Sequence, residues 1–286
     1  MLKSTVKLNL KTILRDPTTL LAALIAVIMQ FMYGLNDYSQ AYLFDMYTDP
    51  GITAEFNGVM NEMMNMFAKP VAQIAFPFFG VIIAVNLFKE MRSHTYDIMS
   101  VGQISFRKFY FGKLIAYYLL GLMMSMILGF AFEIFYLIRE RPFHLEVDWL
   151  RILVSQIAWM FALYTSCLLI PIAIGVFAAS VSGVSLTAPI LNCAYYYLPM
   201  MTPIEKLGIF DYIHVIPDKL FIFMKYFAVH PDDWYYIEIG NDLSARLGVK
   251  SSFKDALISY VLIIMIAVLL LSASYFLLKR RYEKNG

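Results

Sequence analysis

The sequence is poor in charged residues and in cysteine, and it lacks several motifs that carry enzyme chemistry. Charged residues make up only 15% of its 286 residues, whereas a soluble domain carries about 25%. A CxxC pair, an HExxH motif and a GxxxxGK[ST] phosphate loop are all absent from the sequence. The chain therefore has no site of the phosphate-loop type at which to hydrolyse ATP. The two cysteines lie in apolar runs, so they give no disulfide framework.

Two other classes of site are also disfavoured. The formal net charge is only +2, so the chain has no basic surface typical of a nucleic-acid-binding protein. The four histidines lie far apart in polar segments, and their spacing matches no metal-ligand motif. We therefore expect no nucleic-acid partner, no metal site, no catalytic residue and no cofactor bound by this chain.

Apolar residues, by contrast, make up 60% of the chain and gather in six long runs. Each run approaches the ~20 residues that a helix needs to cross about 30 Å of hydrocarbon. The runs are continuous rather than alternating, which favours helices over a β-barrel. The sequence therefore predicts an all-α integral membrane protein with six transmembrane helices in a single transmembrane domain, residues 1–286. The predicted spans are residues 18–35, 70–88, 109–138, 152–179, 184–201 and 256–278.

The segments outside these runs predict the orientation. Residues 1–15 have the pattern of a basic amphipathic helix lying in the membrane interface, and Asp16-Pro17 ends it. Residues 1–17, the connector of residues 88–113 and the tail after Leu278 together hold thirteen Lys or Arg residues against four acids. Positive charge favours the cytosolic side, so we expect both termini in the cytosol of a cell-membrane protein. The aromatic-rich segment 202–255 predicts an external cap between spans five and six.

The connector carries a more specific pattern. It reads FKEMRSHTYDIMSVGQISFRKFYFGK and contains five basic residues and two acids. Together with Leu-Arg-Asp-Pro near the N-terminus, it resembles the cytosolic connector of ATP-binding-cassette exporter permeases of the six-helix, ABC-2-type class. The family often has Pro where this chain has Gln103, so the chain departs from the pattern there. The resemblance covers the N-terminal helix, the connector and the order of the spans.

The resemblance implies a permease subunit rather than an enzyme. Such a subunit pairs with a second copy or a close paralogue, and two separate ATPase chains bind the ATP and Mg²⁺. In the family, the connector, here residues 89–108, forms the coupling helix that docks on the ATPase. The positions that carry this role over are Glu90, Arg92, Thr95, Ile104, Arg107 and Lys113. We expect Glu90, Arg92 and Arg107 to be exposed and to add little stability, because exposed ion pairs contribute only about 0–1 kcal/mol.

A few polar residues inside the spans are candidates for a substrate path. Glu133 lies about five residues from the outer end of span three, roughly 7–8 Å below its mouth. A carboxylate at that depth is costly and usually faces protein or water, although the alternative is that it reaches the headgroups or pairs with Arg151. Gln73 and Gln156 lie at comparable depth in spans two and four, as does Gln30 in span one. Asn192, in the middle of span five, either joins two helices or lines a cavity.

The sequence leaves the substrate and the transport class open. The aromatic- and Met-rich spans suit an amphipathic cargo, with a hydrophobic peptide favoured over a lipid-linked or drug-like molecule. A secondary transporter or channel is the main alternative, although it would favour charges at the centre of the bilayer and repeated halves. An intramembrane enzyme would need paired catalytic groups, and no span contains a histidine. A receptor-like anchor for another subunit is a further alternative.

Overall fold

The computed structural model describes residues 2–36, 71, 75–92, 105–140, 148–181, 190–191, 193–194 and 253–284. Every regular element in these ranges is helical, which confirms the predicted all-helical class for this part of the chain. The predicted cap 202–255 lies outside the described residues, and so does most of the predicted span 184–201. The main helices are α1 (Leu2–Arg15), α2 (Pro17–Asn36), α5 (Phe76–Arg92), α7 (Phe106–Glu140), α8 (Trp149–Cys167), α9 (Leu169–Val181) and α15 (Phe253–Lys284).

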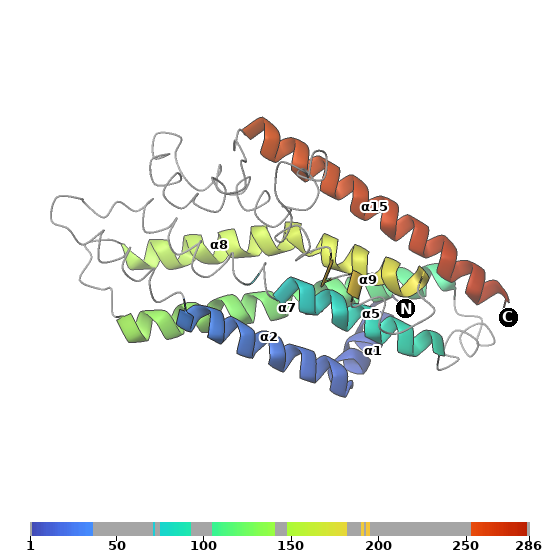
Figure 1. Cartoon of the computed structure of the whole chain (residues 1–286), viewed down its shortest axis with the longest axis horizontal. Helices are drawn as coiled ribbons and strands as arrows, with labels where there is room; N and C mark the ends of the chain where they lie inside the picture. Colours follow the sequence, from blue (N-terminus) through green and yellow to red (C-terminus); the bar gives the residue numbers. More distant parts are fainter. Residues whose placement is uncertain are drawn as a thin grey trace.

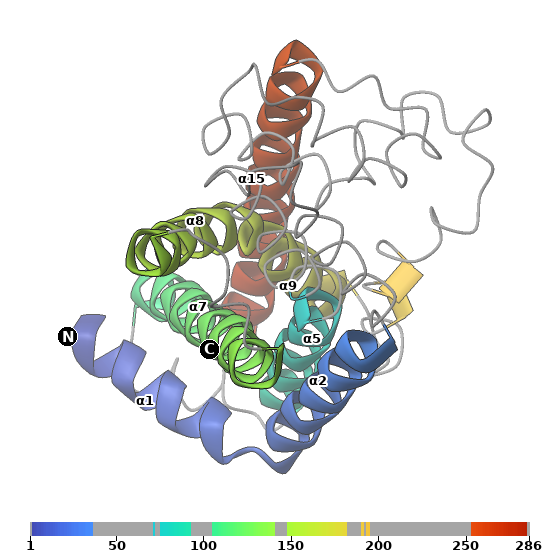
Figure 2. The same cartoon turned by 90° about the vertical axis from the view of Figure 1, so that its left-hand side faces the viewer.

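The longer helices form an elongated bundle, and α1 lies across one end of it (Figures 1 and 2). Helices α2, α5 and α7 alternate in direction along the bundle: α2 leads away from the α1 end, α5 returns and α7 leads away again. Helices α8 and α9 return together, and α15 ends near the same end as α1 (Figure 1). The start of α2, the end of α5, the start of α7 and the C-terminus therefore share one end, which we call the basic end.

The junction between α1 and α2 is a sharp elbow of 69°. Asp16 is the N-cap of α2, because its carboxylate accepts a hydrogen bond of 2.9 Å from the backbone N–H of Thr18. Pro17 takes the first helical position, where its missing N–H costs nothing. In α1, the Ile13 side chain is buried in the core while Leu8 is exposed. A helix thus covers residues 2–15 of the predicted segment 1–15 and ends before Asp16, as predicted.

Two of the described helical segments are long and apolar enough to cross a membrane: Phe106–Phe135 and Tyr260–Glu283. The bent pair of Thr5–Arg15 and Pro17–Gln30 makes a third if it counts as one span. Helix α7 has 35 residues, which is about 52 Å of helix and more than the hydrocarbon layer needs. The described chain is therefore an all-helical protein with two or three candidate membrane spans.

The predicted fourth span, residues 152–179, is two helices rather than one. Helix α8 ends at Cys167, and α9 begins at Leu169 after a one-residue turn. Pro171 lies in the first turn of α9 and has no N–H to donate to a carbonyl in the turn before it. The backbone hydrogen bonds on either side remain. The N–H of Leu168 donates to the carbonyl of Tyr164 at 3.0 Å, and the N–H of Ile172 donates to the carbonyl of Leu168 at 3.3 Å. Pro171 thus accounts for the interruption.

Helices α5 and α9 pack closely because glycine occupies their contact. A Cβ atom added at Gly175 would lie 2.7 Å from the carbonyl oxygen of Gly80 and 3.1 Å from Ile83. Ala84 and Ala178 are buried in the same pair of helices. Small residues let two backbones approach, which is the usual packing of helices in membranes. This contact fixes α5, whose last turn carries the charged residues described below.

Gly175→Ala tests this contact. We expect it to destabilise the protein by about 1–3 kcal/mol, because the added methyl meets backbone rather than a movable side chain. Thermal unfolding of the purified full-length chain in detergent measures the effect. Gly129→Ala is the matched control, since its new Cβ would meet the Sδ of Met160 and the hydroxyl of Tyr164, both at 3.0 Å and both at side-chain ends. Equal losses in the two variants would contradict the close contact of α5 and α9.

Candidate functional site

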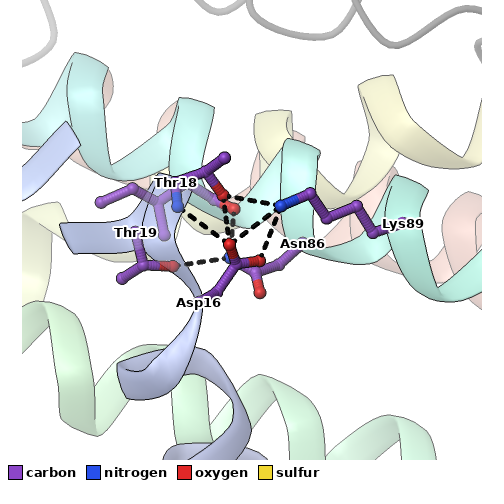
Figure 3. A network of polar contacts seen from close by, with 6 residues as sticks. Asp16, Thr18, Thr19, Asn86 and Lys89 are labelled. Carbon is purple, nitrogen blue, oxygen red and sulfur yellow. Dashed lines mark hydrogen bonds and ion pairs between the residues drawn. The ribbon is translucent and has the colours of Figure 1, made fainter. Parts of the chain in front are cut away.

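The basic end of the bundle holds a network of polar contacts between the elbow and α5 (Figure 3). The Lys89 ammonium group lies 2.9 and 3.1 Å from the two oxygens of the Asp16 carboxylate. It also donates a hydrogen bond of 3.1 Å to the hydroxyl of Thr18, which in turn donates to Asp16 at 2.7 Å. The Asp16 side chain thus caps α2 and binds the end of α5 at the same time.

A buried amide extends this network toward the core. The side-chain NH₂ of Asn86 donates to the hydroxyl of Thr19 at 2.9 Å and to the carbonyl of Ile82 at 3.0 Å. Both Asn86 and Thr19 are buried. A buried amide without these partners would lose its hydrogen bonds to water. The contact therefore fixes how α2 and α5 lie against each other (Figure 3).

The Asp16 carboxyl is shifted toward its charged form. Burial alone would raise the pKa of Asp16, but the hydrogen bonds from Lys89 and Thr18 outweigh it and lower the pKa below the ordinary value of 3.8. The charged form of Asp16 is therefore the one that holds the elbow against α5.

A second ion pair, between Glu90 and Lys113, joins α5 to α7. The Lys113 ammonium group donates to the Glu90 carboxylate, and the two side chains are only 4% and 16% exposed, respectively. The ammonium group also lies 5.3 Å from the ring centre of Phe109 and 5.7 Å from that of Tyr117. Such cation–π contacts stabilise an ammonium group that has lost water. Lys113 is thus held by one carboxylate and two aromatic faces inside the bundle.

This pair corrects the expectation that Glu90 is an exposed residue of a surface connector. Lys113 belongs to a candidate membrane span and is almost fully buried. Arg92 and Arg107 are exposed, as expected, and each guanidinium lies near a ring of its own helix, 5.0 Å from Phe88 and 6.0 Å from Phe111. Thr95 and Ile104 lie outside the described residues.

Sequence reasoning missed an aromatic contact between α7 and α15 at the same end. The ring of Phe106 lies 5.3 Å from the rings of both Tyr275 and Tyr282. Tyr110 contacts Tyr275 edge-on at 5.3 Å, and its hydroxyl donates to the carbonyl of Leu271 at 2.8 Å. The signal was the spacing of Phe106 and Tyr110 by four residues and of Tyr275 and Tyr282 by seven, which places each pair on one helix face.

Toward the opposite end, polar side chains on three helices face the interior. Gln30 on α2, Glu133 on α7 and Gln156 on α8 are 1%, 1% and 0% exposed. Their side-chain oxygens and amide nitrogens have no hydrogen-bond partner within the described part of the chain. In each helix, the residue lies six or seven positions from the terminus that points away from the basic end. That separation corresponds to about 9–10 Å along the helix axis. Burial argues against Glu133 reaching the headgroups.

Gln73 and Asn192 lie outside the described residues. Among the residues that the structure describes, no three His, Cys, Asp or Glu side chains come together as a metal site. Comparisons with protein-family models, with curated proteins and with solved structures found no match. The class shown by the described residues is thus an all-helical protein with helices able to cross a membrane.

The buried pair predicts a large effect of reversing Glu90. Glu90→Lys would place two ammonium groups together with little water, and losing one partner of a buried pair costs about 3–5 kcal/mol. Arg92→Glu, two positions further on, should change the stability by no more than about 0.5 kcal/mol, because Arg92 is exposed. Thermal unfolding in one detergent compares the two variants. If Glu90→Lys is as stable as Arg92→Glu, the buried pair is refuted.

The lowered pKa of Asp16 predicts a stability difference that depends on pH. The charged form is stabilised in the folded state, so its contribution is complete above pH 3.8 and is lost as the pH falls through the lower folded pKa. Asp16→Asn keeps a capping side chain but removes the charge. We expect wild type to melt above Asp16→Asn at pH 7, and the gap to shrink below pH 3.8. A gap that stays constant across this range would exclude the charged Asp16–Lys89 contact.

Proposed function

We propose that this chain is the transmembrane subunit of an ATP-driven exporter of the ABC-2 type. It pairs with a second copy or a close paralogue, and two separate ATPase chains supply the ATP hydrolysis. The resemblance of the connector and of the Arg-Asp-Pro elbow supports the class. The observation that carries the proposal is the Glu90–Lys113 pair, because it locks together the two helices that flank the connector.

The contacts at the basic end suit a device that transmits movement. A displacement of the connector acts first on the end of α5 and the start of α7, which the buried pair joins. The movement then reaches α1 and α2 through the contacts of Lys89 and Asn86 with the elbow. Four helices would therefore move together when an ATPase pushes on the connector. The exposed Arg92, with Thr95 and Ile104 further along the connector, would meet the ATPase surface.

In this proposal the membrane topology is the predicted one. The six spans are α2, α5, α7, the broken pair α8–α9, the segment 184–201 and α15. The thirteen-to-four excess of basic over acidic residues places the basic end in the cytosol, with both termini. The alternating directions of α2, α5, α7 and the α8–α9 pair in Figure 1 support this order for the first four spans. The protein would reside in the cell membrane, with the segment 202–255 outside.

The proposed cargo is amphipathic, and a hydrophobic peptide is the favoured class. Glu133, Gln30 and Gln156 give the interior toward the outer end both a charge and amide groups that described residues leave without partners. Buried polar groups of this kind are costly unless water or a ligand meets them. They would line the outer part of the path, together with Gln73 and Asn192.

The main alternative is a secondary transporter driven by an ion gradient. The buried Glu133 favours it to some extent, because intramembrane carboxylates serve as proton sites in such proteins. In that case transport would need no ATPase and would stop when the proton gradient is dissipated. The two mechanisms therefore differ in one measurable dependence.

Reconstitution tests the proposed function. The tagged full-length chain is purified with the ATPase chain that accompanies it and placed in vesicles, and ATP hydrolysis and peptide release are followed. We expect transport to require ATP and to survive a protonophore. Arg92→Glu should preserve the fold but weaken ATPase binding or coupling strongly, since removing a partner at such an interface costs about 2–5 kcal/mol. Glu133→Gln should leave ATPase binding intact and alter transport.

Two results would contradict the proposal. Transport without ATP that ends with the proton gradient would identify a secondary transporter. An ATPase that binds and is stimulated equally by wild type and by Arg92→Glu would remove the connector from its role.

A further inference from the structure

A groove of about 510 Å³ lies between α7 and α15 near the basic end. Its volume falls within the ~300–1,000 Å³ typical of small-molecule sites. Four residues from the first third of α7 and five from residues 268–276 of α15 form its walls. They are Arg107, Tyr110, Phe111, Leu114, Val268, Leu271, Ser272, Tyr275 and Phe276.

The residues that line the groove are mainly apolar, and a hydrogen bond joins its two helices. The Tyr110 hydroxyl donates to the Leu271 carbonyl at 2.8 Å, and the ring of Tyr110 packs against Tyr275, so these contacts join the two walls. At the sides, Phe111 is 46% exposed and Phe276 is 63% exposed. Both helices contain candidate membrane spans, so the groove opens on surfaces suited to hydrocarbon. An acyl chain matches this lining, whereas a free anion would gain nothing from it.

One charge marks the end of the groove. Arg107 lies in the first turn of α7 and lines the groove, and no carboxylate among the described residues pairs with it. The neighbouring Lys108 and Arg280 are exposed at the same end. Glu283, near the end of α15, pairs with Lys279 at 3.3 Å. The end of the groove therefore offers a guanidinium that pairs with no carboxylate of the described residues, at the start of the candidate span Phe106–Phe135.

We propose that this groove binds an anionic phospholipid, with one acyl chain between α7 and α15 and the phosphate on Arg107. Basic pockets between membrane helices on the cytosolic side bind anionic headgroups in this way. An arginine suits the role, because its planar guanidinium donates two parallel hydrogen bonds to phosphate oxygens. The lipid would cover the exposed faces of Phe111 and Phe276. The inference needs only that α7 and α15 lie in a membrane, and it holds whether or not the chain is an exporter.

The test measures lipid binding to the purified full-length chain, with no ATPase present. Native mass spectrometry in detergent counts bound phosphatidylglycerol and, separately, phosphatidylcholine with the same acyl chains. We expect phosphatidylglycerol to bind more tightly. Arg107→Gln should weaken phosphatidylglycerol about fivefold, the worth of one cation near the headgroups, and leave phosphatidylcholine unchanged.

Two further variants separate charge from shape. Lys108→Gln removes an equal charge one residue away, outside the groove, and should leave binding close to wild type. Ser272→Phe fills the groove without changing charge and should reduce the binding of both lipids. Ser272 is exposed, so this variant should fold, and an unchanged melting temperature verifies that.

Four outcomes would overturn the proposal. Equal affinity for the two lipids would remove the role of the charge, and equal losses for Arg107→Gln and Lys108→Gln would show general attraction to the basic end. Competition by inorganic phosphate as strong as that by phosphatidylglycerol would indicate a simple anion site. Dissociation of a dimer by Ser272→Phe, with no change in lipid binding, would assign the groove to a second copy of the chain.

Discussion

The buried ion pair between Glu90 and Lys113 is the contact on which the rest of the basic end depends. Removing an ammonium group from water costs several kcal/mol, and the carboxylate and aromatic faces around Lys113 offset that cost only when α5 and α7 lie in register. Removing the Glu90 carboxylate would leave the Lys113 ammonium group without its counter-ion inside a candidate membrane span. The pair therefore constrains geometry more than it adds stability, and it does so beside the connector.

The last turns of α5 distribute this constraint to the other helices. Lys89 and Glu90 are adjacent in sequence, so their side chains leave the helix about 100° apart. One consequently reaches the elbow at Asp16 while the other reaches α7. Asn86, one turn earlier, binds Thr19 on α2. The contact of Gly175 with Gly80 holds the same helix against α9. Helix α5 thus joins the elbow, α7 and α9, which is why movement at its end would spread through the bundle.

The sequence was most informative where a local signal decides the structure. Asp16-Pro17 predicted the break between α1 and α2 because an N-cap and an N1 proline act within one turn. Hydropathy predicted where most of the described helices lie. The sequence did not reveal that Lys113 pairs with Glu90, because charge counts do not show which face of a helix meets which neighbour. A proline such as Pro171 can kink or break a helix, and which of these happens in the 152–179 run depends on the backbone geometry around it. The groove between α7 and α15 depends on how two helices far apart in the sequence approach each other. Tyr110 and Leu271, which are hydrogen-bonded across it, are 161 residues apart. No local pattern predicts such an approach.

A double-mutant cycle between Glu90 and Lys113 measures the central contact most directly. The four proteins are wild type, Glu90→Gln, Lys113→Met and the double variant, each unfolded in the same detergent. If the pair is buried and specific, the stability losses of the two single variants should add up to more than the loss of the double variant. The difference, which is the coupling free energy, should exceed about 1 kcal/mol. The double variant should recover part of the loss, because no unpaired charge remains. Additive losses, with a coupling free energy near zero, would show that the two residues act independently and that α5 and α7 are not locked at the connector.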